Sequence, residues 1–135
     1  MHTIIIYTDG GARNNPGPAG AGVVIMDGGR VIAELKQYLG EQTNNWAEYE
    51  ALALALQEAK RRKLQGRSIE IRMDSKLVIE QIAGNWKVKE PTLKPQVAKA
   101  RALLADFPKY KFVHIPREEN IEADRLVNEA LDEAL

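Results

Sequence analysis

Four acidic residues lie beside apolar segments, where an ionised carboxylate is normally unfavourable. Asp9 and Asp74 each follow an apolar, strand-like run, and Glu48 and Asp124 lie near the front of segments with helical apolar spacing. A charged carboxylate next to a core costs free energy unless it is paired or binds a cation. Hard oxygen ligands favour Mg²⁺ or Mn²⁺. Together the acids therefore indicate a divalent-metal site of the kind that cuts a nucleic-acid backbone.

Each acid also has a simpler interpretation when it is taken alone. Glu48 and Asp124 could cap the N-termini of helices, and Asp74 before Ser75 could do the same. Asp9 is harder to explain in this way, because the run before it looks core-facing. The metal hypothesis rests on the contexts of all the acids combined.

The elements that must position these acids are strands first and alternating strands and helices afterwards. Alternating apolar and β-branched residues predict the strands, and apolar residues recurring at i, i+3, i+4 and i+7 predict the helices. Residues 10–22 hold five glycines and two prolines, which indicates a loop or a tightly turned strand entry. Prolines at 91 and 95 disfavour a helix between 85 and 95. The predicted strands are 3–9, 23–26, 31–38, 68–73 and 111–115, and the predicted helices are 44–63, 76–83, one before Pro108 and one at the end of the chain.

This order predicts an α/β fold with a mixed five-stranded sheet, formed by a single domain over residues 1–135. The Asp27–Arg30 turn favours a hairpin, so the first three strands should be antiparallel. The later strand–helix alternation implies right-handed crossovers and parallel strands beside the first one. Ligands gather beyond the carboxyl ends of parallel strands. If the first and fourth strands are neighbours, Asp9 and Asp74 should converge.

Composition excludes several classes of protein. The chain has no cysteine, so disulfides, zinc–thiolate sites and thiol nucleophiles are excluded. No segment approaches the roughly 18 consecutive apolar residues of a membrane span. The N-terminus lacks the pattern of a signal peptide. We therefore expect a cytoplasmic protein without membrane association.

The net charge is zero, but the charges are unevenly distributed. Basic residues dominate between 85 and 117, and acidic residues dominate from 118 to 135. A basic segment beside an acidic one could hold a polyanion near a metal-binding cluster. The alternative is two solvated helix faces of opposite sign.

Six segments, spread in order over nearly the whole chain, match one family pattern. They are Tyr7–Gly11, Asn15–Gly20, Thr43–Leu52, Met73–Ser75, His114–Asn120 and Ala123–Asp124. In this order they resemble the type 1 ribonuclease H family, in particular its bacterial and archaeal subgroup without a basic handle helix. The resemblance implies a ribonuclease H-like fold and an endonuclease that hydrolyses the RNA strand of RNA–DNA hybrids, leaving 5′-phosphate and 3′-hydroxyl ends.

The resemblance also implies roles for individual residues. Asp9, Glu48, Asp74 and Asp124 match the family's metal-binding acids, which would hold two Mg²⁺ ions during catalysis, with Mn²⁺ as an alternative. His114 matches the position of the family's active-site histidine and would assist proton transfer or product release. Arg117 is a competing candidate for that role, and a locally hydrogen-bonded histidine at a strand end is the simpler interpretation of His114.

Substrate contacts are expected around the asparagine-rich segments and the basic segment. Ala12, Asn15, Asn44 and Asn45 resemble contacts to the RNA strand, where the 2′-hydroxyl distinguishes RNA from DNA. The asparagines would equally suit turns and helix caps. The other expected contacts are Thr43 to a phosphate of the DNA strand, Lys76 in place of a glutamine of well-known members, and Trp86, Lys87 and Lys89, with Lys94, in place of the handle. Trp86 could instead be a lid over the core.

Two other functional classes stay open. One is a different nuclease on the ribonuclease H fold, and the other is a noncatalytic hybrid-binding module. Fold alone does not decide between them. The expected partner is an RNA–DNA hybrid, and the expected state is a monomer.

Overall fold

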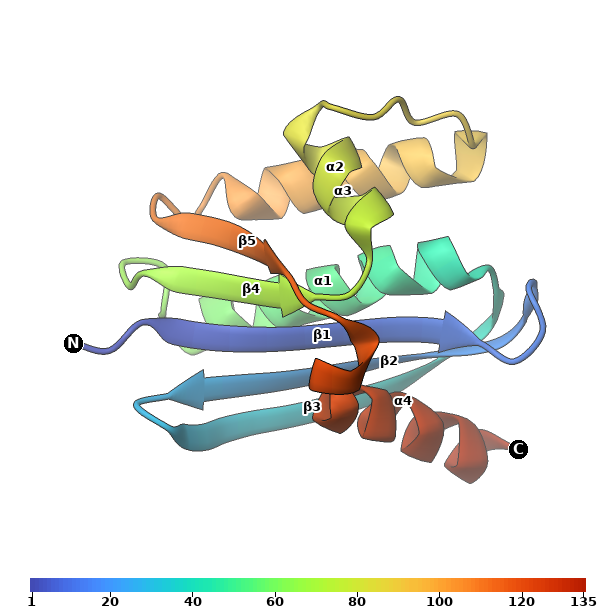
Figure 1. Ribbon diagram of the computed structural model, residues 1–135, viewed down its shortest axis with the longest axis horizontal. Helices are drawn as coiled ribbons and strands as arrows, with labels where there is room; N and C mark the ends of the chain where they lie inside the picture. The colour runs from blue at the N-terminus through green and yellow to red at the C-terminus, as the bar shows by residue number, and fades with distance from the viewer.

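A mixed five-stranded sheet organises the computed structural model, which describes residues 1–135 (Figure 1). β1 pairs with β2, and β2 with β3, in antiparallel fashion, whereas β1 pairs with β4, and β4 with β5, in parallel. The predicted fold class is therefore confirmed. The first and fourth strands are neighbours, which is the condition for Asp9 and Asp74 to converge. In spatial order the strands are β3 (Arg30–Gln42), β2 (Gly17–Asp27), β1 (Ile4–Ala12), β4 (Ile69–Met73) and β5 (Tyr110–His114).

The glycine-rich stretch 10–22 is mostly strand, so its interpretation as a loop was wrong. β1 continues to Ala12 and β2 already begins at Gly17, which leaves a short turn between them. β3 is also longer than predicted and reaches Gln42. Glycine lowers strand propensity, which hides such a strand from a sequence pattern. Backbone pairing across the ladder nevertheless keeps the stretch extended.

The helices cover the sheet from both sides (Figure 1). α1 lies on one face with α2 and α3 beside it, and α4 packs on the other face against β1, β2 and β3. The helices are α1 (Asn44–Arg61), α2 (Lys76–Ala83), α3 (Lys94–Leu104) and α4 (Ile121–Ala134), with single 3-10 turns η1 (Pro91–Leu93) and η2 (Arg117–Glu119). None of these helices has the length and hydropathy needed to cross a bilayer.

Between α2 and α3 the chain forms an irregular segment and the turn η1, with no additional helix. The predicted absence of a handle is therefore confirmed. Pro91 opens η1, and Pro95 lies in the first turn of α3. Proline is tolerated there, because the first N–H groups of a helix have no partner inside the helix. Pro95 therefore marks a helix start, where the sequence pattern suggested that it prevents one.

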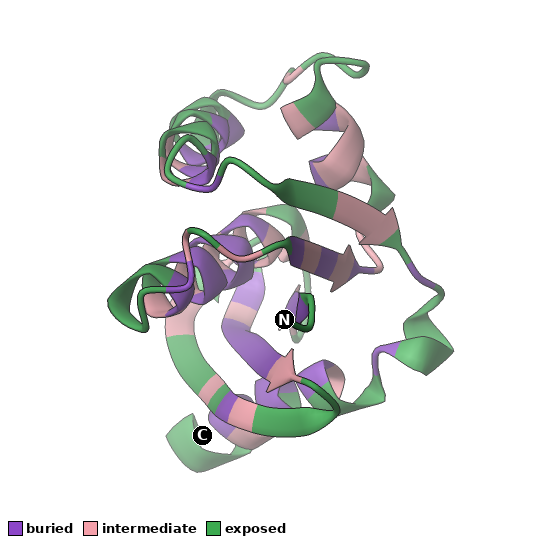
Figure 2. Cartoon of the chain, turned by 90° about the vertical axis from the view of Figure 1, so that its left-hand side faces the viewer, coloured by how far each residue is buried: buried purple, intermediate pink, exposed green.

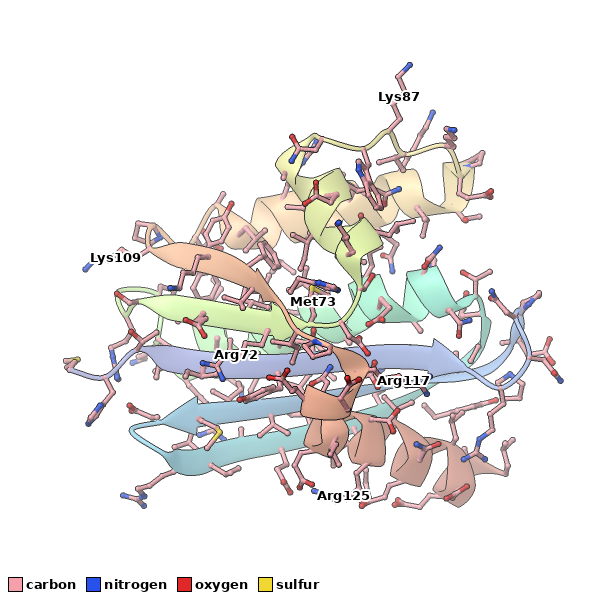
Figure 3. All side chains as sticks on the ribbon, in the orientation of Figure 1. Arg72, Met73, Lys87, Lys109, Arg117 and Arg125 are labelled. Atoms are coloured by element: carbon pink, nitrogen blue, oxygen red, sulfur yellow. The ribbon has the colours of Figure 1, made fainter.

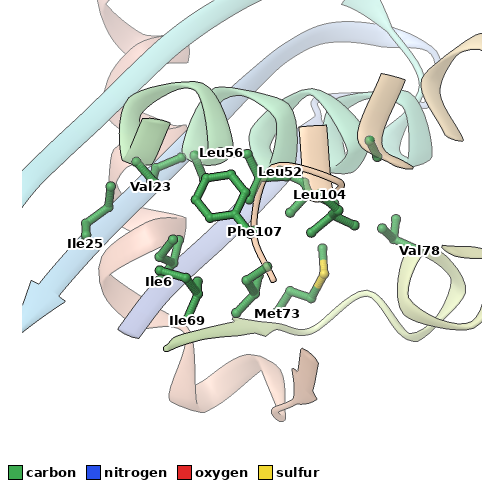
Figure 4. Close-up of a cluster of buried hydrophobic side chains, with 14 of the residues drawn as sticks. Ile6, Val23, Ile25, Leu52, Leu56, Ile69, Met73, Val78, Leu104 and Phe107 are labelled. Atoms are coloured by element: carbon green, nitrogen blue, oxygen red, sulfur yellow. The ribbon is translucent and has the colours of Figure 1, made fainter. Parts of the chain in front are cut away.

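The core lies between the sheet and the layer of α1 and α3. It includes Ile6 of β1, Leu52 and Leu56 of α1, and Phe107, which follows α3 (Figure 4). Burial is greatest on β1, β2 and β4 and on the inward sides of the helices, whereas the outer strands β3 and β5 are largely exposed or half-buried (Figure 2). This packed layer fixes α1 against β1 and so holds the helix that carries Glu48.

Candidate active site

Asp9 and Asp74 lie side by side on neighbouring parallel strands. Tyr7 pairs with Arg72 in the β1–β4 register, and Asp9 and Asp74 each follow two residues later. β1 runs on to Ala12 against β2, so Asp9 marks the end of the parallel pairing and not the end of the strand. The two carboxylates converge at this edge, as the predicted topology required.

Gly10 allows α1 to approach β1 closely enough to bring Glu48 to Asp9. A Cβ atom on Gly10 would lie 2.2 Å from the carbonyl oxygen of Ala47. Without that Cβ, the Gly10 N–H donates a hydrogen bond of 3.0 Å to Glu48 Oε1. Thr43 caps α1 by accepting from the N–H of Trp46, so Glu48 lies in the second turn and is not a cap.

Gly22 plays the corresponding role on the other face of the sheet. It pairs with Asp9 across β1 and β2, and a Cβ atom there would lie 2.3 Å from the carbonyl oxygen of Ala123. The close approach of α4 brings Asp124, in the first turn of that helix, to the same level of the sheet. Two glycines next to the Asp9 position thus let two helices deliver acids from opposite faces.

A cleft of about 450 Å³ is lined by all four predicted acids. The ligand oxygens of Asp9, Glu48 and Asp74 lie within 4.8 Å of one another. Asp124 falls outside that tight group but lies near enough to Asp9 to raise its pKa. The structure therefore brings the four acids together, with three of them forming the inner cluster.

Burial and mutual repulsion make the ionised cluster unfavourable. Burial, with the neighbouring Asp74 and Asp124 carboxylates, raises the pKa of Asp9 to about 8. Burial is also the main cause that raises the pKa of Glu48, followed by the charges of Asp9 and Asp74. The pKa of Asp74 is raised as well, again mainly by burial. Carboxylates of this kind bind a cation readily, because the positive charge compensates the loss of hydration and offsets the repulsion between the carboxylates.

The donor set fits a hard divalent cation. Asp74 Oδ1 is buried and has no hydrogen-bond partner. Ser75 caps α2 by accepting from the N–H of Val78, so capping does not explain the Asp74 carboxylate. A buried anionic oxygen without a partner is costly, and coordination of a metal would satisfy it. Asp9, Glu48 and Asp74 are the residues that would hold such an ion, with Asp124 at their edge.

The two candidates for proton handling occupy different places. His114 ends β5, is exposed, and its Nε2 lies 3.2 Å from the backbone oxygen of Asp74. Arg117 lies in η2 and lines the cleft, where its positive charge lowers the pKa of Asp9, Glu48 and Asp74. Figure 3 labels Arg117 on the segment that crosses β1 between β5 and α4. His114 does not line the cleft.

The residues predicted to contact the RNA strand form a linked turn at the rim of the cleft. The N–H of Ala12 donates to Asn44 Oδ1 at 2.7 Å, and the N–H of Asn44 donates to Asn15 Oδ1 at 3.0 Å. Ala12 and Asn44 line the cleft. Thr43 accepts the cap hydrogen bond, and Lys76 is exposed at the start of α2. The turn interpretation therefore holds for Asn15, whereas the cap of α1 is Thr43, and Asn44 and Asn45 are the first residues of the helix. These bonds use side-chain oxygens and leave the amide N–H groups of Asn15 and Asn44 available.

A second groove, of about 620 Å³, gathers the remaining predicted contacts. Asn45, Trp86, Lys87 and Lys89 all line it. Trp86 is 44% exposed, which excludes its interpretation as a lid over the core. Asn45 and Asn44 are adjacent on α1, so the groove begins next to the asparagine turn.

Sequence reasoning missed several residues beside the acids. Arg13 lines the cleft and donates a hydrogen bond to Asp132 at 2.7 Å. Asn128 also lines the cleft and donates to the backbone oxygen of Asp124 at 3.1 Å. The spacing of Asp124, Asn128 and Asp132, four residues apart, was a signal that they share one helix face.

A further missed residue is Asn120, which is buried. Its Nδ2 donates to the backbone oxygen of Thr8 at 2.8 Å. Thr8 directly precedes Asp9, so this bond ties the segment between Arg117 and Asp124 to β1 beside the acids. No local sequence pattern identifies such a contact between distant residues.

Comparison with known protein families gives one match over most of the chain. The family model described as reverse transcriptase-like matches residues 7–130. The chain is 44% identical over 129 residues to ribonuclease HI of Halobacterium salinarum, covering 95% of this chain and 64% of that protein. It is 33% identical over 147 residues to ribonuclease H of Hydrogenovibrio crunogenus, covering 98% of each. A bifunctional protein of Mycobacterium tuberculosis is 46% identical, but the chain spans only 36% of its length.

Solved structures show the same similarity in three dimensions. LC11-RNase H1 in complex with RNA/DNA hybrid superposes with a TM-score of 0.93 at 54% identity, covering 98% of this chain and 99% of that one. RNase H1 of Halobacterium salinarum superposes with a TM-score of 0.90 at 42% identity, covering 97% and 98%. The first curated relatives are longer, and the chain spans about a third to two thirds of their length.

Proposed function

Because this chain belongs to the ribonuclease H family, we propose that it is an endonuclease that hydrolyses the RNA strand of RNA–DNA hybrids, giving 5′-phosphate and 3′-hydroxyl ends. The observation that carries the proposal is the cleft in which Asp9, Glu48 and Asp74 bring ligand oxygens within 4.8 Å of one another. A similar structure in complex with RNA/DNA hybrid supports the substrate class.

The proposed cofactor is Mg²⁺, with two ions during catalysis and Mn²⁺ as a substitute. When bound, the ions would supply an activated water and would neutralise charge at the scissile phosphate and the leaving oxygen. Asp9 would be the shared ligand, because its carboxylate lies within 4.8 Å of the ligand oxygens of Glu48 and Asp74 and close enough to Asp124 to be affected by that charge. The Gly10 N–H holds Glu48 in one orientation. Asn128 lies on the same helix face as Asp124 and binds its backbone oxygen.

Two side chains are proposed to assist at the edge of the cluster. The Arg117 guanidinium lines the cleft and can meet a phosphate oxygen there. The His114 imidazole lies one hydrogen bond from the Asp74 backbone, and histidine is the residue type most often used to transfer protons. His114 could handle a proton or help the product to leave, whereas the arginine stays protonated and would act through its charge, on a phosphate oxygen or on product release. The position of Arg117 in the cleft favours it for this charge-based role.

Recognition of the hybrid is proposed to use both grooves. Ala12, Asn15, Asn44 and Asn45 would meet the RNA strand and its 2′-hydroxyls. Thr43 and Lys76 would meet phosphates, and Trp86, Lys87 and Lys89 would hold the other strand. Asn45 lines the Trp86 groove and directly follows Asn44 of the asparagine turn, so the two surfaces adjoin. This adjacency supports one continuous path for the substrate. Action as a cytoplasmic monomer is part of the same proposal.

The main alternative is a noncatalytic hybrid-binding module on the same fold. The presence of all four acids in one cleft favours catalysis, because an ionised cluster that serves no cation only destabilises the protein. A different nuclease on this fold is disfavoured by the asparagine turn, whose amides suit a strand with 2′-hydroxyls.

The proposal can be tested with labelled RNA–DNA hybrid, duplex RNA, duplex DNA and single strands, each with Mg²⁺, Mn²⁺ or chelator. We expect cleavage of the RNA strand of the hybrid alone, and only with a divalent ion. The Asp9→Asn variant, purified in the same way, controls for contaminating host nuclease. Cleavage in excess chelator, or equal cleavage of duplex DNA, would overturn the proposal.

A further inference from the structure

A buried glutamine links the helix that carries Glu48 to the segment that carries Trp86. Gln81 of α2 is 4% exposed. Its Oε1 accepts a hydrogen bond of 2.7 Å from the hydroxyl of Tyr49, the residue that follows Glu48 on α1. Its Nε2 donates a hydrogen bond of 3.3 Å to the backbone oxygen of Lys87. One amide side chain therefore joins α1 to the connection between α2 and α3.

A glutamine at this place is not explained by packing. The neighbouring inward residue on α2, Val78, is apolar and packs into the core, as a leucine could at position 81. A buried amide costs free energy unless both its donor and its acceptor are satisfied. Burial raises the pKa of Tyr49 to about 12, so its hydroxyl stays a donor at every working pH. Both polar groups of the Gln81 side chain are therefore hydrogen-bonded, and neither bond involves the acid cluster.

The segment after α2 has few other attachments beyond its first residues. The N–H groups of Asn85 and Trp86 both donate to the backbone oxygen of Glu80, at 2.9 and 3.2 Å. These bonds close the end of the helix, where Gly84 adopts a left-handed conformation. Beyond Trp86, the Lys87 carbonyl is held by Gln81, and Val88 packs against the core.

The bridge holds the Lys87 carbonyl inward and so directs the side chains outward. The Lys87 side chain extends away from the body of the molecule (Figure 3). Trp86, Lys87 and Lys89 line the same groove as Asn45, and Gln81 lies at its floor. The orientation of these side chains relative to α1 therefore depends on the Tyr49–Gln81–Lys87 connection.

We propose that Gln81 is a positioning residue, which fixes the Trp86–Lys89 segment relative to α1 so that its aromatic ring and its cations meet the hybrid backbone in register with the acid cluster. The inference rests on the proposed function, and Gln81 affects the substrate only through the Trp86–Lys89 segment. Loss of the bridge should loosen the segment without disturbing the acids. It should therefore weaken the grip on substrate and leave the chemical step unchanged.

The test compares Gln81→Leu and Gln81→Met with a matched control, Gln96→Leu. Gln96 of α3 is 5% exposed and donates to the Trp46 backbone oxygen and to Glu50, so it also bridges two helices, but it does not contact the 85–90 segment. We expect the Gln81 variants to raise KM for the hybrid roughly two- to tenfold, the worth of one buried hydrogen bond, with kcat unchanged. Gln96→Leu should lower Tm without changing KM.

A second measurement reads the segment directly and needs no nucleic acid. In a Trp46→Phe background, Trp86 is the single tryptophan. Acrylamide should quench its fluorescence more strongly in the Gln81 variants than in the wild type or in Gln96→Leu. Tyr49→Phe removes only the hydroxyl donor, and it should shift KM and quenching in the same direction if the larger substitutions fail to fold.

The outcomes separate this inference from the proposed function. Unchanged KM and unchanged quenching in folded Gln81→Leu would overturn the positioning role while the enzyme still cuts hybrid. An equal rise of KM in Gln96→Leu would also overturn it, because general loosening would then explain the effect. If the wild type does not cut hybrid, the proposed function fails and the role in substrate grip fails with it.

Discussion

At the scale of single residues, the acid cluster is stable only with help from outside the chain. Burial, reinforced by the carboxylates of Asp74 and Asp124, raises the pKa of Asp9 to about 8, and the Arg117 charge opposes this shift only in part. The same arrangement that makes the metal-free cluster unfavourable makes cation binding favourable. Function and stability should therefore respond in opposite directions when Asp9 loses its charge.

We expect Asp9→Asn to abolish turnover and to stabilise the metal-free protein. The amide cannot act as an anionic shared ligand, and it relieves repulsion with Glu48 and Asp74. The gain in unfolding free energy in chelator should be at least about 1 kcal/mol at pH 8. Thermal unfolding and hybrid cleavage measure the two effects. Asp132→Asn, an exposed acid, is the control, and near wild-type activity of Asp9→Asn would contradict the shared-ligand role.

The raised pKa of Asp9 also predicts how stability depends on pH without metal. The unfolded carboxyl titrates near 3.8 and the folded one at about 8, so between these values the folded state holds a proton that the unfolded state has released. Protonated Asp9 makes its full contribution to the free energy of unfolding below about pH 4, and this contribution is lost as pH rises to about 8. Unfolding in chelator at pH 5 to 9 should show this decline, and Mg²⁺ should reduce it. If the free energy of unfolding in chelator does not change with pH, either in the wild type or in Asp9→Asn, the raised pKa of Asp9 is contradicted.

We expect both His114→Ala and Arg117→Ala to lower turnover less than the loss of an acid, with Arg117→Ala the more damaging. Arg117 lines the cleft and its charge reaches three of the acids, whereas His114 lies outside the cleft. A positioned proton-transfer group is typically worth about 10²–10⁴-fold. Single-turnover cleavage and product-release rates separate the two steps. A larger loss in His114→Ala would return the role to the histidine.

At the scale of elements, the site depends on how closely two helices approach the sheet. Gly10 and Gly22 lie under α1 and α4, and each removes a Cβ atom that would strike a backbone carbonyl of the helix. Asp9 and Asp74 lie where the parallel pairing of β1 and β4 ends, but Glu48 and Asp124 reach them only because these helices lie close. The glycines therefore set the positions of the acids without contacting substrate.

Gly22→Ala should push α4 away from β2 and move Asp124. The new Cβ would lie 2.3 Å from the Ala123 oxygen, a contact that must be relieved by backbone movement. We expect a loss of about 1–3 kcal/mol in unfolding free energy, as for other overpacked cores, and a lower kcat. Gly66→Ala is the matched control, because nothing lies within 4 Å of a Cβ atom there. Equal behaviour of the two variants in denaturant unfolding would contradict the close-packing role.

At the scale of the whole molecule, a zero net charge conceals two different surfaces. The acidic side of α4 is largely neutralised by ion pairs from other elements. Arg13 pairs with Asp132, and Lys36 of β3 pairs with Glu129 and Glu133. Arg125 belongs to α4 itself and pairs with Glu122 of the same helix and with Glu34 of β3. The lysines of the segment between α2 and α3 have no such partners, so the free positive charge lies beside the Trp86 groove.

Replacing Lys87, Lys89 and Lys94 together with Ala should weaken hybrid binding and flatten its salt dependence. Each lost phosphate contact should reduce the log–log slope by about 0.7–0.9, and kcat at saturation should change little. Binding titrations across salt concentrations measure this. Lys109→Ala is the control, because Lys109 lies at the far end of β5 (Figure 3). An unchanged slope would mean that these lysines are only a solvated face.

The sequence by itself determined the type and approximate place of most elements, the directions in which the strands pair, and the four acids that line the cleft. Helix periodicity and the caps at Thr43 and Ser75 are local signals, since each depends on residues a few positions apart. The acids were recognisable because a carboxylate beside an apolar run is unfavourable wherever the chain folds. The antiparallel first half and the parallel second half followed from short connections and the handedness of crossovers.

Only the tertiary structure decided which residues meet across the sheet. The glycine-rich stretch became strand because its ladder partners lie elsewhere in the chain, and Gly10 and Gly22 acquired their meaning from helices that pack over them. Arg117 rather than His114 lines the cleft, and Gln81 bridges Tyr49 to the Lys87 carbonyl. These contacts join residues far apart in sequence, and no local pattern encodes them, because their energies arise only when the backbone has already folded.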